Sequence, residues 1–270
     1  MERLISMNIF KFEFKYLYKQ IIIWTISLSS IFIIFSAMFP AYHDNKDAVA
    51  QMFATYPPEV LKALGIDINI IFSFNGFYSF ILTYILLLAV IMSLYLSISV
   101  FAREKKNKTS DFLLVKPISR QKIFLTKLAA SGLSLIIINL LYLMISLTMF
   151  DFLNGINKND FLLIFSSLFI VEIIFFAMGI FLSIMLPKIK NIGNITTGVG
   201  FIFFIIGMVA GILDQEWLNY LTPFKYFDSS YILKHHALDS KYIILSIVII
   251  SYLLSFSYIS YLKRDIDQVS

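Results

Sequence analysis

Residues 68–102, INIIFSFNGFYSFILTYILLLAVIMSLYLSISVFA, form a run of 35 residues without a charged side chain. A helix of about 20 apolar residues crosses a bilayer, so this run is too long for one perpendicular span. We expect Phe74, Asn75 and Gly76 to lie shallow at the outer surface and the span itself to begin near Phe77. The run therefore predicts a membrane protein with helical spans.

The composition of the whole chain agrees with this class. Of its 270 residues 59% are hydrophobic and only 14% are charged, which excludes an ordinary soluble domain. We predict an all-α, polytopic membrane protein with a single transmembrane domain that covers residues 1–270. Cysteine is absent, which excludes disulfides and thiolate chemistry. The six predicted spans are 21–39, 77–101, 128–150, 161–186, 192–213 and 242–262.

The basic residues predict how the chain is oriented in the membrane. Six spans place both termini on one side, where the N-terminal segment has 4 Lys and Arg, the loop between spans two and three has 8, and residues 188–190 and 263–264 have 2 each. That side holds 16 of the 22 basic residues and the other side holds 6. Cytoplasmic loops carry the excess of Lys and Arg, so we expect both termini in the cytoplasm and the protein in the cell membrane. This distribution explains the net charge of +5 without nucleic-acid binding.

The N-terminal segment, residues 1–19, is too charged to span. Its residues 10–19 alternate as in a strand, yet Lys11, Lys15 and Lys19 also fall on one stripe of a helix. A strand would find no partner in a lipid interface, whereas a helix satisfies its own backbone. We predict an amphipathic helix that lies on the inner leaflet. The apolar run that follows can span and offers no cleavage site at 37–39, so we do not expect a signal peptide.

The loop of residues 102–127 contains a short apolar segment among its basic residues. Phe112, Leu113, Leu114 and Val115 follow Thr109, Ser110 and Asp111 and precede Pro117, a pattern that predicts one or two helical turns. An apolar patch with a charged rim is typical of a surface that docks another protein. Alternatively, these residues anchor the loop in membrane lipid.

Short motifs in and beyond this loop resemble those of ABC-2 type permeases, the membrane subunits of ABC exporters. The resemblance extends over the whole chain through the six-span layout, and Lys108 stands where the family usually has a glycine. The motifs are Glu104, the stretch Thr109-Ser-Asp-Phe-Leu-Leu, the stretch Lys116-Pro-Ile-Ser-Arg120, the stretch Ile123-Phe-Leu-Thr-Lys127, the outer stretch Thr222-Pro-Phe-Lys-Tyr-Phe227 and the final stretch Tyr261-Leu-Lys-Arg-Asp-Ile266.

This resemblance implies a permease that pairs with a second permease, as a homodimer or a heterodimer, and docks cytoplasmic ATPase subunits. No Gly-x-x-x-x-Gly-Lys-Ser/Thr motif occurs in the chain, so ATP and Mg are expected on the separate ATPase subunit and no cofactor is expected on this chain. The residues that the resemblance assigns to the ATPase-coupling loop are Glu104, Thr109, Phe112, Leu113, Leu114, Pro117, Ser119 and Arg120.

Three further residues within the spans have two alternative roles each. Glu172 is the one charged residue inside a predicted span. Placing a charged side chain in the middle of a membrane helix costs about 2.5 to 3.5 kcal/mol of insertion free energy, so Glu172 should face protein or water and not lipid. It either lines the transport path or accepts a structural hydrogen bond from a neighbouring span. Gly207 and Gly211 have the small-xxx-small spacing of closely packed helices. They either contact a second permease or pack within the subunit.

The histidines and the polar residues of the spans argue against a metal site and against an intramembrane enzyme. His43, His235 and His236 have no partner at metal-ligand spacing except Asp239 after His235, so we expect no metal site. An intramembrane enzyme needs at least two catalytic groups at one depth, and the spans offer Glu172 without a partner base. A membrane sensor or assembly partner without transport is the other alternative.

Spans with few polar groups suit an amphipathic or hydrophobic cargo such as a peptide, an antibiotic or a lipid.

Overall fold

The computed structural model describes residues 2–103, 118–153, 155, 157–213 and 215–263. All elements among these residues are helices, which confirms the all-α prediction. They are α1 (Glu2–Ser36), α2 (Phe39–Asp44), α3 (Lys46–Ala54), α4 (Pro58–Ala63), α5 (Phe74–Phe101), α8 (Arg120–Phe152), α9 (Lys158–Met185), α10 (Ile192–Leu213), α11 (Glu216–Asn219), η1 (Pro223–Lys225), α12 (Ser229–His235) and α13 (Ser240–Leu262).

Six of these helices, α1, α5, α8, α9, α10 and α13, are long and apolar enough to cross a membrane, which confirms the predicted number of spans. Four of them, α5, α8, α9 and α13, begin earlier than the predicted spans because a polar side chain caps the first turn, and in α13 Asp239 accepts a hydrogen bond from the backbone N–H of Lys241. Ser73 accepts a hydrogen bond from the backbone N–H of Gly76, Ser119 caps α8, and Asn157 caps α9. Phe74, Asn75 and Gly76, which we expected to lie shallow at the surface, are therefore buried in the first turn of α5.

The N-terminal segment is helical, as predicted, but it is not a separate helix. Helix α1 continues without a break from Glu2 into the first span. Lys11, Lys15 and Lys19 are exposed along one stripe, whereas Ile9 and Leu17 are buried on another face of the helix. Helix α1 as a whole packs against α8 and α5, and Leu17 belongs to the main apolar core, so the segment follows the bundle instead of standing apart from it.

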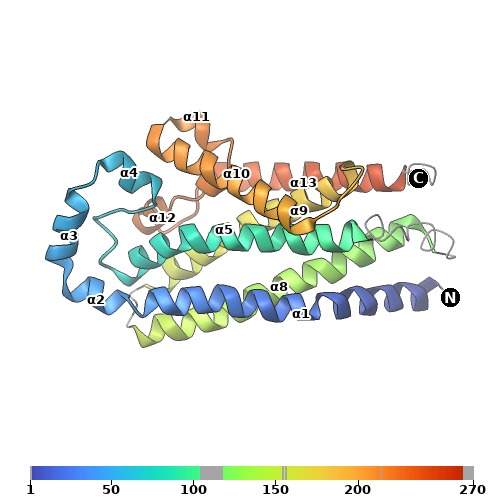
Figure 1. Ribbon diagram of the computed structural model, residues 1–270, viewed down its shortest axis with the longest axis horizontal. Coiled ribbons are helices and arrows are strands. Elements are labelled where there is room, and N and C mark those ends of the chain that lie inside the picture. The colour runs from blue at the N-terminus through green and yellow to red at the C-terminus, as the bar shows by residue number, and fades with distance from the viewer. Residues whose placement is uncertain (1, 104–117, 154, 156, 214, 264–270) are drawn as a thin grey trace.

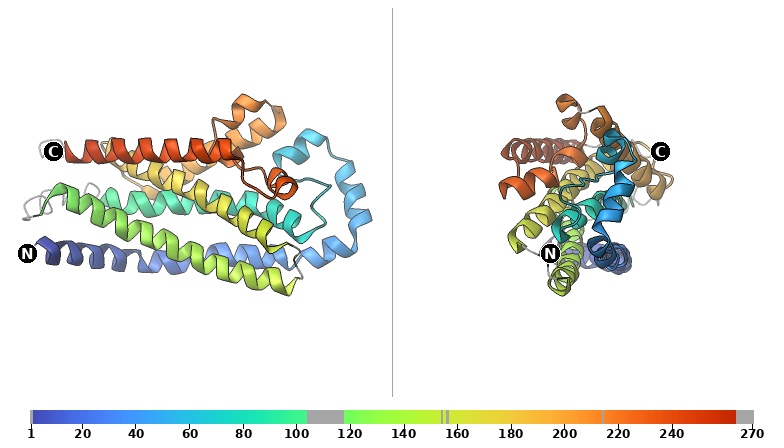
Figure 2. Two further views of the ribbon diagram at one scale, coloured as in Figure 1. Left: turned by 180° about the vertical axis from the view of Figure 1, so that it is seen from behind. Right: turned by 90° about the vertical axis from the view of Figure 1, so that its left-hand side faces the viewer.

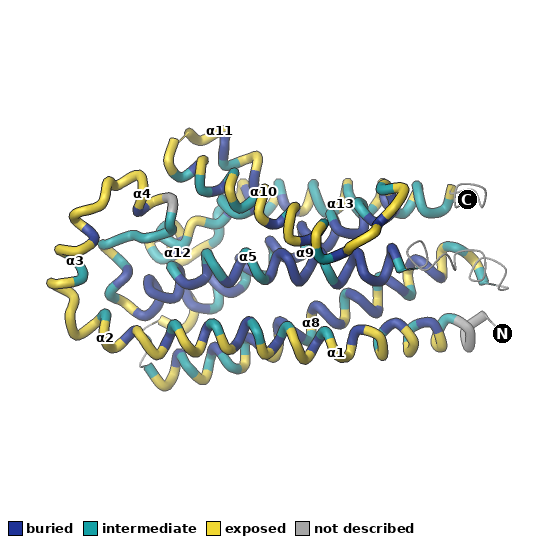
Figure 3. Tube along the Cα trace, viewed as in Figure 1, coloured by how far each residue is buried: buried dark blue, intermediate teal, exposed yellow. Residues whose placement is uncertain are grey.

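The centre of the bundle is formed by α5 and α9, which lie along each other and bury most of their apolar residues (Figure 3). Their close approach depends on Gly179, because a Cβ atom there would lie 2.0 Å from Ser97 Oγ. Helices α1 and α8 cover one side of this pair (Figures 1 and 2). Helix α10 packs on α5 and α13 packs on α9, and both expose most of their apolar surface, as is normal for helices in lipid.

The bundle has two distinct ends. The start of α1, the end of α5, the start of α8 and the end of α13 lie together at the end that we call the loop end (right in Figure 1). Helices α2, α3, α4, α11 and α12 lie at the opposite end, the cap end. The six basic residues predicted to be outside lie in the short helices α3, α4, η1 and α12 or in the first turns of α9 and α13, which start at the cap end. They are Lys46, Lys62, Lys158, Lys225, Lys234 and Lys241.

Candidate functional site: the loop end of the bundle

The last residue described before the predicted coupling loop, Arg103, is fixed to α1. Its Nη2 atom lies 2.5 Å from Oε1 of Glu13, in an ion pair that leaves only 12% of the arginine side chain and 1% of the glutamate side chain exposed. The guanidinium also stacks over the rings of Phe12 and Tyr16, at 4.6 and 4.8 Å from their centroids. The end of α5 is thereby held against the first third of α1.

The first residues described after the loop are held by α8 and α13. Ser119 accepts a hydrogen bond from the backbone N–H of Lys122, at 3.4 Å, and so starts α8. Arg120 donates from Nη1 to the backbone oxygen of Leu262, at 3.0 Å, in the last turn of α13. A cation at a helix C-terminus is favoured by the helix dipole, so this contact stabilises the end of α13.

Lys127 connects α8 to the end of α5. Its side chain is buried, with 1% exposed, and its ammonium donates to the backbone oxygen of Val100 at 2.8 Å. Beside it the ring of Phe124 packs edge-on against Phe101, with centroids 5.2 Å apart, and against Tyr258 of α13 at 5.3 Å. Three helices, α5, α8 and α13, therefore meet in one layer at the loop end.

The turn between α9 and α10 lies at the same end. Ile189 inserts into a small apolar cluster with Ile98, Ala102 and Ile192, while Lys188 and Lys190 remain exposed. This arrangement agrees with the predicted short basic turn after the fourth span, and it attaches the turn to the end of α5.

Glu172 lies in the interior of the bundle with no exposed surface. Asn139 of α8 donates a hydrogen bond from Nδ2 to its carboxylate. The structural alternative thus has a partner on a neighbouring helix, as a buried carboxylate requires. A role in the transport path stays a prediction.

Gly207 is buried against its own chain. Thr222 donates from Oγ1 to the backbone oxygen of Phe203 at 2.9 Å, which brings the segment after α11 back along α10. A Cβ atom at position 207 would lie 3.3 Å from Cβ of Phe224 in that segment. This contact supports packing within the subunit, whereas a contact of Gly207 and the half-buried Gly211 with a second permease stays a prediction.

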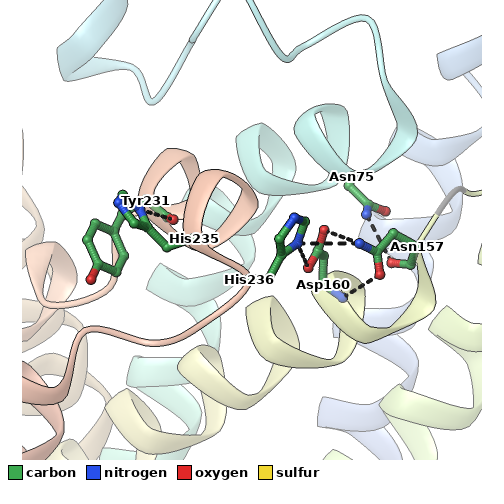
Figure 4. Close-up of polar contacts among 6 residues, drawn as sticks. All are labelled: Asn75, Asn157, Asp160, Tyr231, His235 and His236. Carbon is green, nitrogen blue, oxygen red and sulfur yellow. Dashed lines mark hydrogen bonds and ion pairs between the residues drawn. The ribbon is translucent and has the colours of Figure 1, made fainter.

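His235, the last residue of α12, and His236, its C-cap, take part in separate polar contacts at the cap end (Figure 4). His236 Nδ1 lies 2.7 Å from Oδ1 of the buried Asp160, and Asn157 donates to the other carboxylate oxygen at 2.6 Å. His235 points away and contacts the backbone oxygen of Tyr231. In the described ranges, no three His, Cys, Asp or Glu side chains come together as metal ligands. The contacts of His236 with Asp160 and of Asp160 with Asn157 join the start of α9 to the end of α12.

Among the described residues outside the six membrane helices, two ionisable groups have shifted pKa values, and both lie at the cap end. The hydrogen bond from Lys241 at 2.6 Å lowers the pKa of the exposed Glu216 carboxyl. Burial, and after it the neighbouring Tyr242, raises the pKa of Tyr226 to about 12. Both groups keep their usual charge at neutral pH, so neither indicates acid or base catalysis.

The model of the family described as ABC-2 family transporter protein matches residues 7–266 of the chain. The chain belongs to this family. The predicted resemblance is therefore confirmed, and the protein is a multi-pass membrane component of an ABC transporter. A search of curated protein sequences finds no match to the chain.

The residues that the resemblance assigns to the ATPase-coupling loop fall into two groups. Ser119 and Arg120 are described and hold the start of α8. The predicted coupling helix lies outside the described residues, together with the rest of the assigned loop set: Glu104, Thr109, Phe112, Leu113, Leu114 and Pro117.

Glu13 is a charged residue of the permease that the sequence motifs do not single out. It lies four residues after Ile9 and four before Leu17, so it belongs to the buried stripe of α1. That i, i+4 spacing is visible in the sequence and was the available signal.

Proposed function

We propose that this ABC-2 permease docks its ATPase through the loop of residues 104–117. The observation that supports the proposal is that both flanks of the loop are anchored: Arg103 pairs with Glu13, and Arg120 bonds to the end of α13. A loop whose flanks are attached to α1, α5, α8 and α13 passes a push on to those helices. The apolar residues Phe112 and Leu113 then supply the docking contact that the sequence predicts.

ATP and Mg are assigned to the separate ATPase subunit in this proposal. The chain has no phosphate-binding P-loop, so energy has to come from a partner that docks at the loop end. The loop end is then cytoplasmic, and the permease lies in the cell membrane with both termini inside.

The proposed cargo is an amphipathic or hydrophobic molecule such as a peptide, an antibiotic or a lipid, which the transporter exports. The described interior of the bundle is filled by apolar side chains and offers Glu172 as its deepest charge. We therefore place the path between this permease and a second permease, in contact with membrane lipid. The alternative functions are an intramembrane enzyme and a sensor or assembly partner without transport.

The experiment that tests this function uses the tagged permease and a candidate ABC ATPase from the same genome, expressed together and reconstituted in lipid vesicles. We expect the two subunits to purify as a complex and the permease to change the rate of ATP hydrolysis. If the ATPase neither associates with the permease nor responds to it, the sensor alternative is favoured.

The orientation gives a separate prediction. A single cysteine at position 108 should be protected from an impermeant thiol reagent in intact cells, because the basic loop lies inside. Single cysteines at positions 43, 157 and 234 should be labelled, since these residues belong to the cap end. The native chain has no cysteine, so each signal has one source. Labelling at position 108 in intact cells would reverse the proposed orientation.

A further inference from the structure

Helix α1 carries a basic stripe on the face that points away from the bundle. Lys11, Lys15 and Lys19 are all exposed, and their spacing of four residues places the side chains one above another. Within the described residues, no carboxylate pairs with any of the three, and Glu13 lies on the opposite, buried face of the helix. Helix α1 lies at the edge of the bundle (Figures 1 and 2). The stripe therefore faces the surroundings of the permease and not another helix.

The level of the stripe in the membrane follows from the segment after it. Lys19 is the last charged residue before residues 20–42, which contain none. A helix crosses the hydrocarbon core with about 20 such residues, so the core begins just after Lys19. Helix α1 is continuous and rises about 1.5 Å per residue, so Lys15 lies only about 6 Å further out than Lys19. Both lysines thus lie in the headgroup layer, which is about 5 to 8 Å thick on each side.

The same face of α1 continues into the hydrocarbon core as an apolar surface. Ile22 and Ile26 follow Lys15 at i+7 and i+11, which places them on the same stripe of the helix, and both are exposed. A phospholipid has the same order of groups, with a phosphate next to two acyl chains. One lipid molecule can therefore place its phosphate against the two lysines and its chains against the two isoleucines.

Two tyrosines flank the lysines at the headgroup level. Tyr16 and Tyr18 are both exposed. Tyrosine is typical of the membrane–water interface, which supports the level assigned to Lys15 and Lys19. Its hydroxyl can donate a hydrogen bond to a phosphate or ester oxygen, and a lysine donates a stronger, charge-assisted one. The group that this face complements is therefore an anionic phosphate.

We propose that Lys15 and Lys19 bind the phosphate of an anionic phospholipid in the leaflet at the loop end, and that Lys11 adds to the attraction. The lipid is a fixed component that holds α1 at its depth in the membrane, and it is not the cargo. The site depends neither on the ATPase nor on the exported molecule. A docked protein fits this face less well, because Ile22 and Ile26 lie in the hydrocarbon core, where they meet lipid chains.

The test compares two lipids that differ only in the headgroup. Dioleoylphosphatidylglycerol or dioleoylphosphatidylcholine is titrated into the full-length permease in detergent, and native mass spectrometry counts the bound lipid. We expect the wild type to bind the phosphatidylglycerol more tightly. The variant Lys15→Gln with Lys19→Gln should bind it about 30-fold more weakly and each single variant about five-fold, because one basic residue at an anionic surface contributes about a factor of five. Binding of the phosphatidylcholine should not change.

Two control variants separate the stripe from net charge. Lys15→Arg with Lys19→Arg keeps both charges and should keep the affinity for phosphatidylglycerol. Lys188→Gln with Lys190→Gln removes the same charge from the exposed turn between α9 and α10, at the same end of the bundle. Ile189 between them is buried and offers no apolar surface to lipid chains, so this variant should also keep the affinity. Glutamine is a good helix former, so all variants should unfold at the wild-type midpoint without added lipid.

The opposite results would overturn the proposal. Unchanged affinity of the Lys15 and Lys19 glutamine variants for phosphatidylglycerol removes the site. An equal loss in the Lys188 and Lys190 variant shows that net charge, and not the stripe, attracts the lipid. Displacement of the lipid by an equal concentration of soluble glycerol 3-phosphate shows a site for free phosphate. Glutamine variants that keep the lipid but no longer co-purify with the ATPase assign the stripe to a protein instead.

Discussion

Replacing Phe112 and Leu113 together by aspartate is expected to abolish co-purification of the permease with its ATPase. Burial of each large apolar side chain contributes about 1.5 to 3 kcal/mol, so losing both weakens the complex by about 100-fold or more. The added charges increase the loss, because an aspartate in an apolar groove leaves a carboxylate without water. The six membrane helices contain neither residue, so the variant should still insert into the membrane. The readout is the amount of ATPase recovered with the tagged permease.

The matched control adds the same two negative charges elsewhere at the loop end. Gln121 and Asn191 are both exposed there. Aspartate at 121 lies in the first turn of α8, and aspartate at 191 can still accept the hydrogen bond that Asn191 receives from the backbone N–H of Asn194. The variant Gln121→Asp with Asn191→Asp should therefore retain the ATPase. Equal recovery of the ATPase with the wild type, the Phe112→Asp and Leu113→Asp variant and this control would show that Phe112 and Leu113 anchor the loop in lipid and do not dock a protein.

Replacing Asn139 by leucine is expected to lower the free energy of unfolding by about 3 kcal/mol. The substitution removes the hydrogen-bond donor of Glu172 and leaves the carboxylate buried in the packed interior. The measurement is the midpoint of unfolding in lipid or mild detergent, compared with that of the wild type.

Two further variants show whether the loss comes from this contact. Glu172→Gln keeps an oxygen that can accept from Asn139 and should lose little stability. The double variant Asn139→Leu with Glu172→Met removes both polar groups and should recover most of the loss, because neither partner is left unpaired. If Asn139→Leu unfolds at the same midpoint as the wild type, the carboxylate has another partner, and the structural role assigned to Asn139 is wrong.

Several features of the permease could be predicted from short stretches of sequence. The number of spans follows from uncharged runs such as 68–102, because the thickness of the bilayer sets the length of a helix that crosses it. The helix starts at Ser73, Ser119 and Asn157 were also readable, since a capping side chain acts on a backbone N–H only two or three residues away. Hydrophobicity alone places these helix starts too late, because it does not register the capping residues.

The contacts at the loop end of the molecule could not be predicted from such short stretches. Glu13 and Arg103 are 90 residues apart in the sequence, and only the packing of their helices brings them together. No residue near Glu13 in the sequence indicates that a cation will face it. Lys127 appeared to be the basic end of a loop, yet its ammonium is buried against Val100 because α8 begins at Arg120 and carries it down beside α5.

By itself the sequence determined the membrane class, the six helices, the basic character of one end and the resemblance to ABC-2 permeases, because each depends on composition or on neighbours within a few residues. Only the tertiary structure decided that α1 is continuous and packs along α8, that Gly207 faces Phe224, and that Glu172 is paired with Asn139. These features depend on which helix faces lie together, and a side chain's burial and partners come from residues far away in the chain.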